Sequence, residues 1–177
     1  RMGIQSASEA TKADYKRNYS NKKVMSSAQL INEFKEQVGA PQYDIILDNP
    51  WESDEQVEET LMMLAQIPAP FHLGFYSLTF YPGTPLYDKA KEDGMLKDGF
   101  EYDLNEVYRK CYAGHEETYL NRVFYLLNNS VGEITPEMMS LLLNKTIRKL
   151  QLGWLLYLAL SARYIAPVRL VVEASKD

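Results

Sequence analysis

Cysteine is almost missing from this sequence of 177 residues, which contains only Cys111. A single cysteine can form neither an internal disulfide nor a thiolate cluster for a metal ion, so the sequence excludes a small disulfide-stabilised scaffold. A shortage of disulfides is typical of a reducing compartment, and no secretory or transit segment is recognisable in the sequence. We therefore expect a cytoplasmic protein.

Long apolar runs and clusters of basic residues are also missing. The longest apolar run, Gly153 to Leu160, is far shorter than the roughly 20 residues that a membrane-spanning helix needs. The net charge is −5, and 19 Lys and Arg residues are scattered among 24 Asp and Glu residues. Because nucleic-acid binding needs grouped basic side chains, we expect neither a membrane nor a nucleic acid as a partner.

The composition that is present, 46% hydrophobic and 24% charged, is that of an ordinary folded domain. Apolar runs bounded by turn residues predict strands at Met2 to Ser6, Tyr43 to Leu47 and Phe71 to Phe80. Helical patterns separate these runs. Strands that alternate with helices need crossover connections, so the predicted fold class is α/β with a parallel sheet.

Capping residues predict where the intervening helices begin. Ser26 and Gln29 have the spacing of a capping box, and the helix that they open is predicted to end at Gly39. Its core-facing side is predicted from four apolar residues at helical spacing, which are Leu30, Ile31, Phe34 and Val38. Three further helices are predicted to begin at the caps Ser8, Ser53 and Thr84.

The pattern changes after Gly99, where the strand signals end. Helices are predicted at Leu104 to Tyr112, at Glu116 to Asn129, and from Pro136 to about Tyr164. The simplest division is an α/β part over residues 1–99 and a helical accessory region over residues 100–177.

Asp44 is the first candidate functional residue, because it lies inside an apolar run. A buried carboxylate costs several kcal/mol unless something pairs with it, although pairing with a helix N-terminus would satisfy it without any function. Asp48 and Glu52 are interpreted as turn and cap residues. His72 and His115 are isolated in the sequence, with no second ligand at metal-binding spacing, so we expect no metal site from them.

Four stretches taken together resemble a known family. They are Gly3 to Glu9, Arg17 with Asn18, Tyr43 to Glu52, and Leu78 to Tyr87 followed by Gly94. In this order they resemble the C-terminal half of the catalytic barrel of radical S-adenosylmethionine (radical SAM) enzymes. The most similar subgroup carries a cobalamin-binding domain and includes Fe–S oxidoreductases related to the magnesium-protoporphyrin monomethyl ester cyclases. The resemblance implies half of a (β/α) TIM-like barrel over residues 1–99 and a helical C-terminal extension.

The sequence departs from the pattern of this family at three points. Asp48-Asn-Pro-Trp51 replaces the usual Gly-Leu-Pro-Gly, and Ser6-Ala-Ser8 replaces Ser-Gly-Ser. The three-cysteine motif that binds the 4Fe–4S cluster is absent, and in such barrels it lies in the N-terminal half. We therefore expect this chain to be a fragment that is inactive alone, from a parent that is an oxidoreductase or a methyltransferase.

The resemblance implies a mechanism and a set of contacts. In this family a reduced 4Fe–4S cluster cleaves S-adenosylmethionine to a 5′-deoxyadenosyl radical, which removes hydrogen from a substrate that the sequence does not identify. The cluster, and a cobalamin where one is used, would be bound by the missing part. The implied cofactor-binding residues are Gln5, Ser6, Arg17 and Asp44 on the ribose and methionine groups, and Ser77 and Thr79 along the cavity. No catalytic residue or metal ligand is implied within this chain.

Two other functions stay open on the residues alone. One is another half-barrel or nucleotide-binding domain, although no glycine-rich phosphate loop is present. The other is a non-catalytic interaction module. A reading frame that continues upstream into Cys-x3-Cys-x2-Cys would favour the enzyme. Because about three strands cannot close a barrel and would leave open sheet edges, we also expect the isolated chain to form a homo-oligomer.

Overall fold

The sheet is parallel, as predicted. A computed structural model describes residues 1–96, 111–112 and 115–150. Within them, one sheet has the strand order β1 (Met2–Gln5), β2 (Gln42–Leu47), β3 (His72–Ser77), and both pairings are parallel. The strand predicted to reach Phe80 is therefore too long. The chain leaves the sheet after Ser77 and turns toward the next helix.

Eight helices accompany this sheet in the described part of the chain. They are α1 (Glu9–Asp14), α2 (Asn21–Glu33), α3 (Lys35–Val38), α4 (Asp54–Leu64), α5 (Pro85–Glu92), α7 (Tyr119–Asn129), α8 (Pro136–Leu142) and α9 (Lys145–Lys149). The predicted caps Ser8, Ser53 and Thr84 are confirmed, because each side chain accepts a hydrogen bond from a backbone N–H in the first turn. Ser53 also forms a capping box with Gln56.

The predicted start of α2 is wrong. The helix begins at Asn21, because Ser20 accepts a hydrogen bond from the Lys23 N–H at 3.3 Å. The predicted capping residue, Ser26, lies inside the helix. Both serines precede a helical pattern, and the earlier one caps the helix in the folded chain.

The predicted core face of α2 is also wrong. Leu30, Phe34 and Val38 are 56%, 49% and 62% exposed, whereas Val24 and Ala28 enter the core. The earlier start shifts the buried side of α2 toward its first turns. A break at Phe34 then separates α2 from α3, so that Val38 does not continue the buried side of α2.

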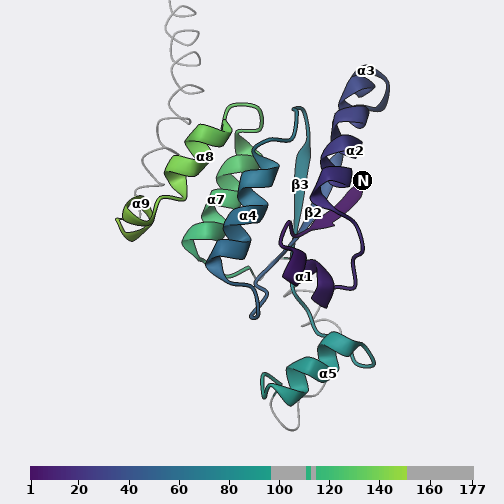
Figure 1. Cartoon of the computed structure of the whole chain (residues 1–177), viewed down its shortest axis with the longest axis vertical. Coiled ribbons are helices and arrows are strands. Elements are labelled where there is room, and N and C mark those ends of the chain that lie inside the picture. The colour runs from purple at the N-terminus through teal and green to yellow at the C-terminus, as the bar shows by residue number, and fades with distance from the viewer. Residues whose placement is uncertain (97–110, 113–114, 151–177) are drawn as a thin grey trace, which may run out of the picture.

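The apolar core lies on one face of the sheet. Tyr43, Ile45 and Leu47 alternate onto this face of β2 and are at most 3% exposed. Buried side chains of α2, α4, α7 and α8 belong to the same core. Figure 1 shows α4, α7 and α8 beside one another, whereas α5 lies apart from them, beyond the carboxyl ends of the strands.

The C-terminal helical pattern is interrupted. The helix predicted to run continuously from Pro136 ends at Leu142, and Asn144 caps α9 by accepting a hydrogen bond from the Thr146 N–H at 2.9 Å. The rest of this predicted helix, and most of the one predicted at Leu104 to Tyr112, lie outside the described residues. Among the described helices, none is long and apolar enough to cross a membrane.

Side chains close part of both edges of the sheet. On β1 the Tyr19 hydroxyl donates to the backbone oxygens of Gly3 at 3.1 Å and Ile4 at 2.8 Å. On β3 the Asn128 Oδ1 accepts the Leu73 N–H at 2.7 Å. Unpaired backbone groups on an edge strand invite another strand. Tyr19 and Asn128 therefore oppose association through the sheet.

Removing both edge contacts should strengthen self-association. A chain with Tyr19→Phe and Asn128→Leu is expected to have a dimer dissociation constant lower by about thirtyfold. Each change frees strand groups to pair with a second chain, and each new hydrogen bond contributes about 1 kcal/mol. Sedimentation equilibrium measures this constant. Tyr125→Phe with Asn129→Leu makes the same chemical changes at exposed positions and serves as the control. Equal dimer dissociation constants for the two double variants would show that the Tyr19 and Asn128 contacts do not prevent association through the strand edges.

Candidate functional site

Two neighbouring strands end in a strained backbone conformation. Gln5 at the end of β1 has a φ of 63°, and Asp48 directly after β2 has a φ of 59°. This left-handed region costs a residue other than glycine roughly 1–2 kcal/mol. Strain of this kind is concentrated at functional sites. The carboxyl edge of the sheet therefore has the backbone strain that is typical of a functional site.

A cavity of about 320 Å³ adjoins these strand ends. Its volume lies at the lower end of the range of roughly 300–1,000 Å³ for small-molecule sites. The polar part of its lining includes Gln5, Asp48, Asn49, Glu52 and Asn121, and Ile45, Leu47 and Phe124 supply apolar surface. The buried Oε1 atom of Gln5 has no hydrogen-bond partner within the described residues, so it is available to a ligand.

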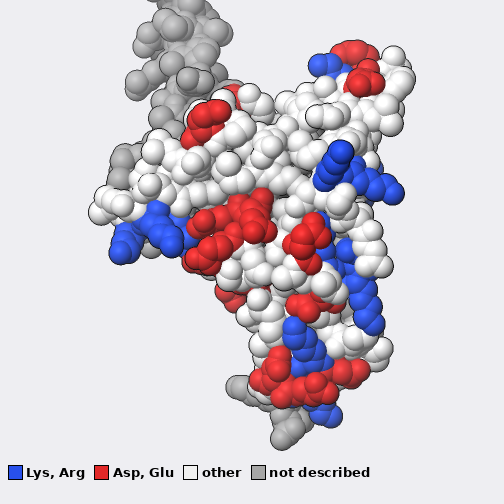
Figure 2. Space-filling view, in the orientation of Figure 1, with Lys and Arg blue, Asp and Glu red and all other residues white. Residues whose placement is uncertain are grey.

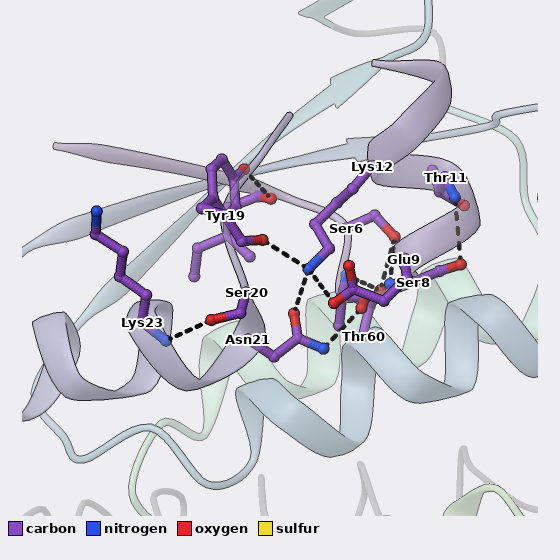
Figure 3. Close-up of polar contacts among 12 residues, drawn as sticks. Ser6, Ser8, Glu9, Thr11, Lys12, Tyr19, Ser20, Asn21, Lys23 and Thr60 are labelled. Atoms are coloured by element: carbon purple, nitrogen blue, oxygen red, sulfur yellow. Dashed lines mark hydrogen bonds and ion pairs between the residues drawn. The ribbon is translucent and has the colours of Figure 1, made fainter. Parts of the chain in front are cut away.

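Ser6 joins the end of β1 to the start of α4. Its side chain is 1% exposed. The hydroxyl donates to Glu52 Oε1 at 2.6 Å and lies 3.2 Å from Thr60 Oγ1. Thr60 Oγ1 also accepts the Ala7 N–H at 2.9 Å. Figure 3 shows Ser6 and Thr60 facing each other beneath α1. These contacts fix the position of Glu52 at the cavity.

Glu52 is more than the turn and cap residue that the sequence suggests. It lines the cavity and is largely removed from water. Burial raises the pKa of its carboxyl group above the ordinary value of 4.5, and the hydrogen bond from Ser6 opposes this shift. A cationic ligand in the cavity would favour the ionised form of this carboxyl group.

Glu52→Gln should change how stability depends on pH. A carboxyl group with a raised pKa binds its proton more tightly in the folded chain than in the unfolded chain. Stability therefore falls as pH rises from about 4.5 through the raised pKa, and the loss persists above it. Glutamine keeps an acceptor for Ser6 but does not ionise, so the variant should lack this loss. Urea unfolding at several pH values from about 4 to 8 checks this, and parallel curves for the two proteins would contradict it.

Asp48 accepts hydrogen bonds from three parts of the chain, and its side chain is 6% exposed. Its Oδ1 accepts from Asn121 Nδ2 at 2.7 Å and from the Glu116 N–H at 3.3 Å. Its Oδ2 accepts from the Ser77 hydroxyl. His115 places Nδ1 3.7 Å from the same Oδ2. Asp48 is thus the turn residue that the sequence suggests, and it also binds residues that are distant in the sequence. His115, which is isolated in the sequence, lies close to it in the fold.

Four of the predicted contact residues lie at or near this edge. Gln5 lines the cavity, and Ser6 supports it through Glu52. Ser77 binds Asp48. Thr79 donates its hydroxyl to the Ser77 backbone oxygen at 3.1 Å and so shapes the chain after β3.

Asp44 lies on the other face of the sheet. It alternates with the buried Tyr43 and Ile45, and its carboxylate accepts from Arg1 Nε at 2.6 Å and Gln42 Nε2 at 2.8 Å. Gly74 on β3 leaves room for these side chains, because a Cβ there would lie 2.8 Å from Asp44 Oδ1. Asp44 is thus paired, and it is not among the residues that line the cavity.

Arg17 lies in an exposed loop, and its backbone N–H donates to Lys12 O at 2.8 Å. Lys12 has no recognisable signal in the sequence, yet it is fully buried. Its ammonium group donates to Glu9 Oε1 at 2.6 Å, to Tyr19 O at 3.0 Å and to Asn21 Oδ1 at 2.9 Å. Figure 3 shows Lys12 between these three acceptors. It joins α1 to the loop that carries Arg17 and to the start of α2.

The surface beside the cavity is divided by charge. Figure 2 shows acidic side chains gathered over α4, with basic side chains beside them at α9. Asp54, Glu55, Glu58 and Glu59 belong to α4, and Lys145, Arg148 and Lys149 belong to α9. Arg148 lines the cavity and pairs with Asp54 and Glu58. The positive charge of Arg148 is therefore offset by these two carboxylates. The other acidic residues of the lining then give the cavity a negative potential.

A search against models of protein families gave no match, and none of the curated proteins matches the sequence. Among the described residues, no group of three or more His, Cys, Asp and Glu side chains is placed to hold a metal ion.

Proposed function

We propose that this chain supplies the S-adenosylmethionine-binding half of a radical SAM barrel, as part of an Fe–S oxidoreductase or a related methyltransferase. The main observation in support of this proposal is that Gln5, Ser6 and Glu52 lie together beside one cavity at the carboxyl edge of a parallel sheet. Ligands of parallel (β/α) barrels bind at this edge, because strand ends and following loops present free polar groups there. The sequential order of the strands also supports a half-barrel.

The residues at the cavity suit a cationic nucleoside. The unpaired Gln5 Oε1 is an acceptor for a ribose hydroxyl or an ammonium group. Glu52 adds a carboxylate whose ionised form a positive ligand would favour. Asp48 and Ser77 hold the loop that follows β2. Contacts of Arg17 and Asp44 with the ribose and methionine groups, and a place for Thr79 along the cavity, stay predictions from the resemblance. None of these three residues is among those that line this cavity.

The residues of this chain do not fit a 4Fe–4S cluster. Such a cluster is held by several cysteine thiolates, and the sequence contains only Cys111. The cluster ligands, and any cobalamin site, therefore belong to another part of the proposed parent. In such a parent, cysteines outside this chain would hold the cluster, which would supply an electron for the cleavage of S-adenosylmethionine. The role proposed for this chain is limited to binding and orienting the nucleoside.

Isothermal titration calorimetry with S-adenosylmethionine tests the proposal on the chain as it stands. Gln5→Leu should weaken binding by about 1 kcal/mol, or roughly fivefold, because it removes an acceptor. Gln66→Leu makes the same change at an exposed position after α4 and serves as the control. No heat of binding at millimolar ligand, or equal binding by both variants, would overturn the assignment of this cavity.

The same titration with ATP distinguishes the proposed function from the alternative of a nucleotide-binding domain. A domain of that kind would bind ATP and not S-adenosylmethionine.

A different observation favours a non-catalytic interaction module. The apolar side chains of Leu30, Phe34 and Val38 on α2 and α3 are exposed. A module of that kind would bind neither nucleotide.

A further inference from the structure

Asn49 presents an unused hydrogen-bond donor at the cavity. The residue lies two positions after the end of β2, is 8% exposed and lines the cavity. Its Oδ1 accepts the Trp51 N–H at 3.0 Å, which fixes the orientation of the amide, because a backbone N–H can pair only with the oxygen. Its Nδ2 is buried and has no hydrogen-bond partner within the described residues. A buried donor in this state gains most from a ligand that accepts its hydrogen bond.

A neighbouring hydroxyl group does not use up this donor. Tyr15, at the end of α1, interacts with the Asn49 amide, but its hydroxyl does not reach hydrogen-bond geometry and is itself buried without a partner in the described part of the chain. A carboxamide nitrogen carries two N–H groups. At least one N–H of Asn49 is therefore available to a ligand.

Gln5 supplies the complementary group at the same cavity. Its Oε1 is a buried acceptor that also has no hydrogen-bond partner among the residues that the structure describes. Because β1 and β2 pair in parallel, their carboxyl ends bring Gln5 and Asn49 to one edge of the sheet. A ligand that satisfies both residues must carry a donor for Gln5 and an acceptor for Asn49.

The rest of the lining restricts the kind of ligand group that can do this. Ile45, Leu47 and Phe124 line the cavity and are at most 3% exposed. Such apolar walls favour a flat ring over a ribose, whose hydroxyl groups would lose water there without enough partners. Asp48 and Glu52 in the same lining disfavour a phosphate or another anion. A heteroaromatic base that has an amino group and a ring nitrogen meets all these conditions.

We propose that Asn49 and Gln5 recognise the base of the ligand, with Asn49 Nδ2 donating to a ring nitrogen and Gln5 Oε1 accepting from an amino group. This recognition rests on the proposed function, which places a nucleoside in the cavity, and it narrows the donor bound by Gln5 to an amino group on a ring. A base that lacks the amino group is bound less tightly, because it leaves the buried oxygen of Gln5 unpaired.

Calorimetric titration with adenosine tests the role of Asn49, because adenosine carries such a base without the sulfonium and methionine groups. Asn49→Asp keeps the acceptor for the Trp51 N–H and replaces the donor by an oxygen, so it should weaken adenosine binding by about tenfold or more. Asn129→Asp makes the same change at an exposed position at the end of α7 and should leave the affinity unchanged. Equal affinities of these two variants would overturn the role of Asn49.

Purine riboside, which lacks the amino group of adenosine, tests the role of Gln5. It should bind the unchanged chain about fivefold more weakly than adenosine does, whereas Gln5→Leu should bind the two nucleosides equally. This comparison needs no variant of Asn49, so it still decides the question if Asn49→Asp fails to fold. Equal binding of both nucleosides by the unchanged chain would contradict recognition of the amino group.

Titration of the same chain with S-adenosylmethionine separates this recognition from the proposed function. Binding of adenosine but not of S-adenosylmethionine would overturn the proposed function and support recognition of the base. Binding of S-adenosylmethionine but not of adenosine at millimolar concentration would overturn recognition of the base alone. Binding of neither compound would overturn both.

Discussion

Replacing Lys12 with methionine is expected to lower the free energy of unfolding by about 3 kcal/mol. Methionine matches the length of the lysine stem and keeps the helix propensity of α1. It removes an ammonium group that donates to Glu9 Oε1, Tyr19 O and Asn21 Oδ1. Because Lys12 is fully buried, water cannot replace these bonds without disturbing the packing. The loss should separate α1 from the loop at Tyr19.

Urea unfolding followed by circular dichroism measures this loss. Lys23→Met is the matched control, because Lys23 is exposed in the first turn of α2. The control should change the free energy of unfolding by less than about 0.5 kcal/mol. Lys12→Met should also weaken the Tyr19 contact with β1, since Tyr19 O is one of the three acceptors. A Lys12 variant as stable as the control would show that the buried ammonium group contributes no net stability.

Local signals account for the parts of the fold that the sequence predicts correctly. Ser53 with Gln56 and Thr84 with Pro85 are caps whose contacts lie within one helical turn. The parallel sheet follows from strand and helix lengths alone. These features need no knowledge of distant residues. The start of α2 is different, because Ser20 and Ser26 are both plausible caps, and packing of Val24 and Ala28 against the core selects between them.

Alternation along β2 could have placed Asp44 from the sequence. Side chains alternate between the two faces of a strand. Asp44 stands between Tyr43 and Ile45, which are both 1% exposed, so it must point away from the core. The apolar run suggests that Asp44 is buried, whereas the alternation of side chains along the strand places Asp44 on the face away from the core. On that face Asp44 forms an ion pair with Arg1. Glu52, beyond the strand end, is the carboxyl group that reaches the cavity.

The rest of the site could not be predicted, because its contacts join residues that are distant in the sequence. Asp48 follows β2, whereas its partners Asn121 and His115 belong to α7 and the segment before it. No local spacing relates them. Lys12 is similar, since its acceptors come together only when α1 folds against the start of α2. A lysine in a short polar helix otherwise indicates a solvated position.

Asp48→Ala should be the most destabilising change at the carboxyl edge, with a loss of about 3 kcal/mol in the free energy of unfolding. Alanine removes the acceptor of Asn121 Nδ2 and of the Ser77 hydroxyl, whose residues are 6% and 2% exposed. Each buried donor without a partner costs roughly 1–3 kcal/mol. Alanine also fits the left-handed backbone at this position less well than aspartate does.

Asp48→Asn is the matched variant for this prediction. Asparagine keeps one acceptor oxygen and tolerates the left-handed conformation, so its loss should be about 1 kcal/mol. Urea unfolding of both variants at one pH gives the comparison. Asn121→Leu, combined with each variant, then tests the contact directly, since its effect should shrink once Asp48 no longer accepts its hydrogen bond. If alanine and asparagine destabilise equally, the loss comes from the charge of Asp48 and not from its acceptor oxygens.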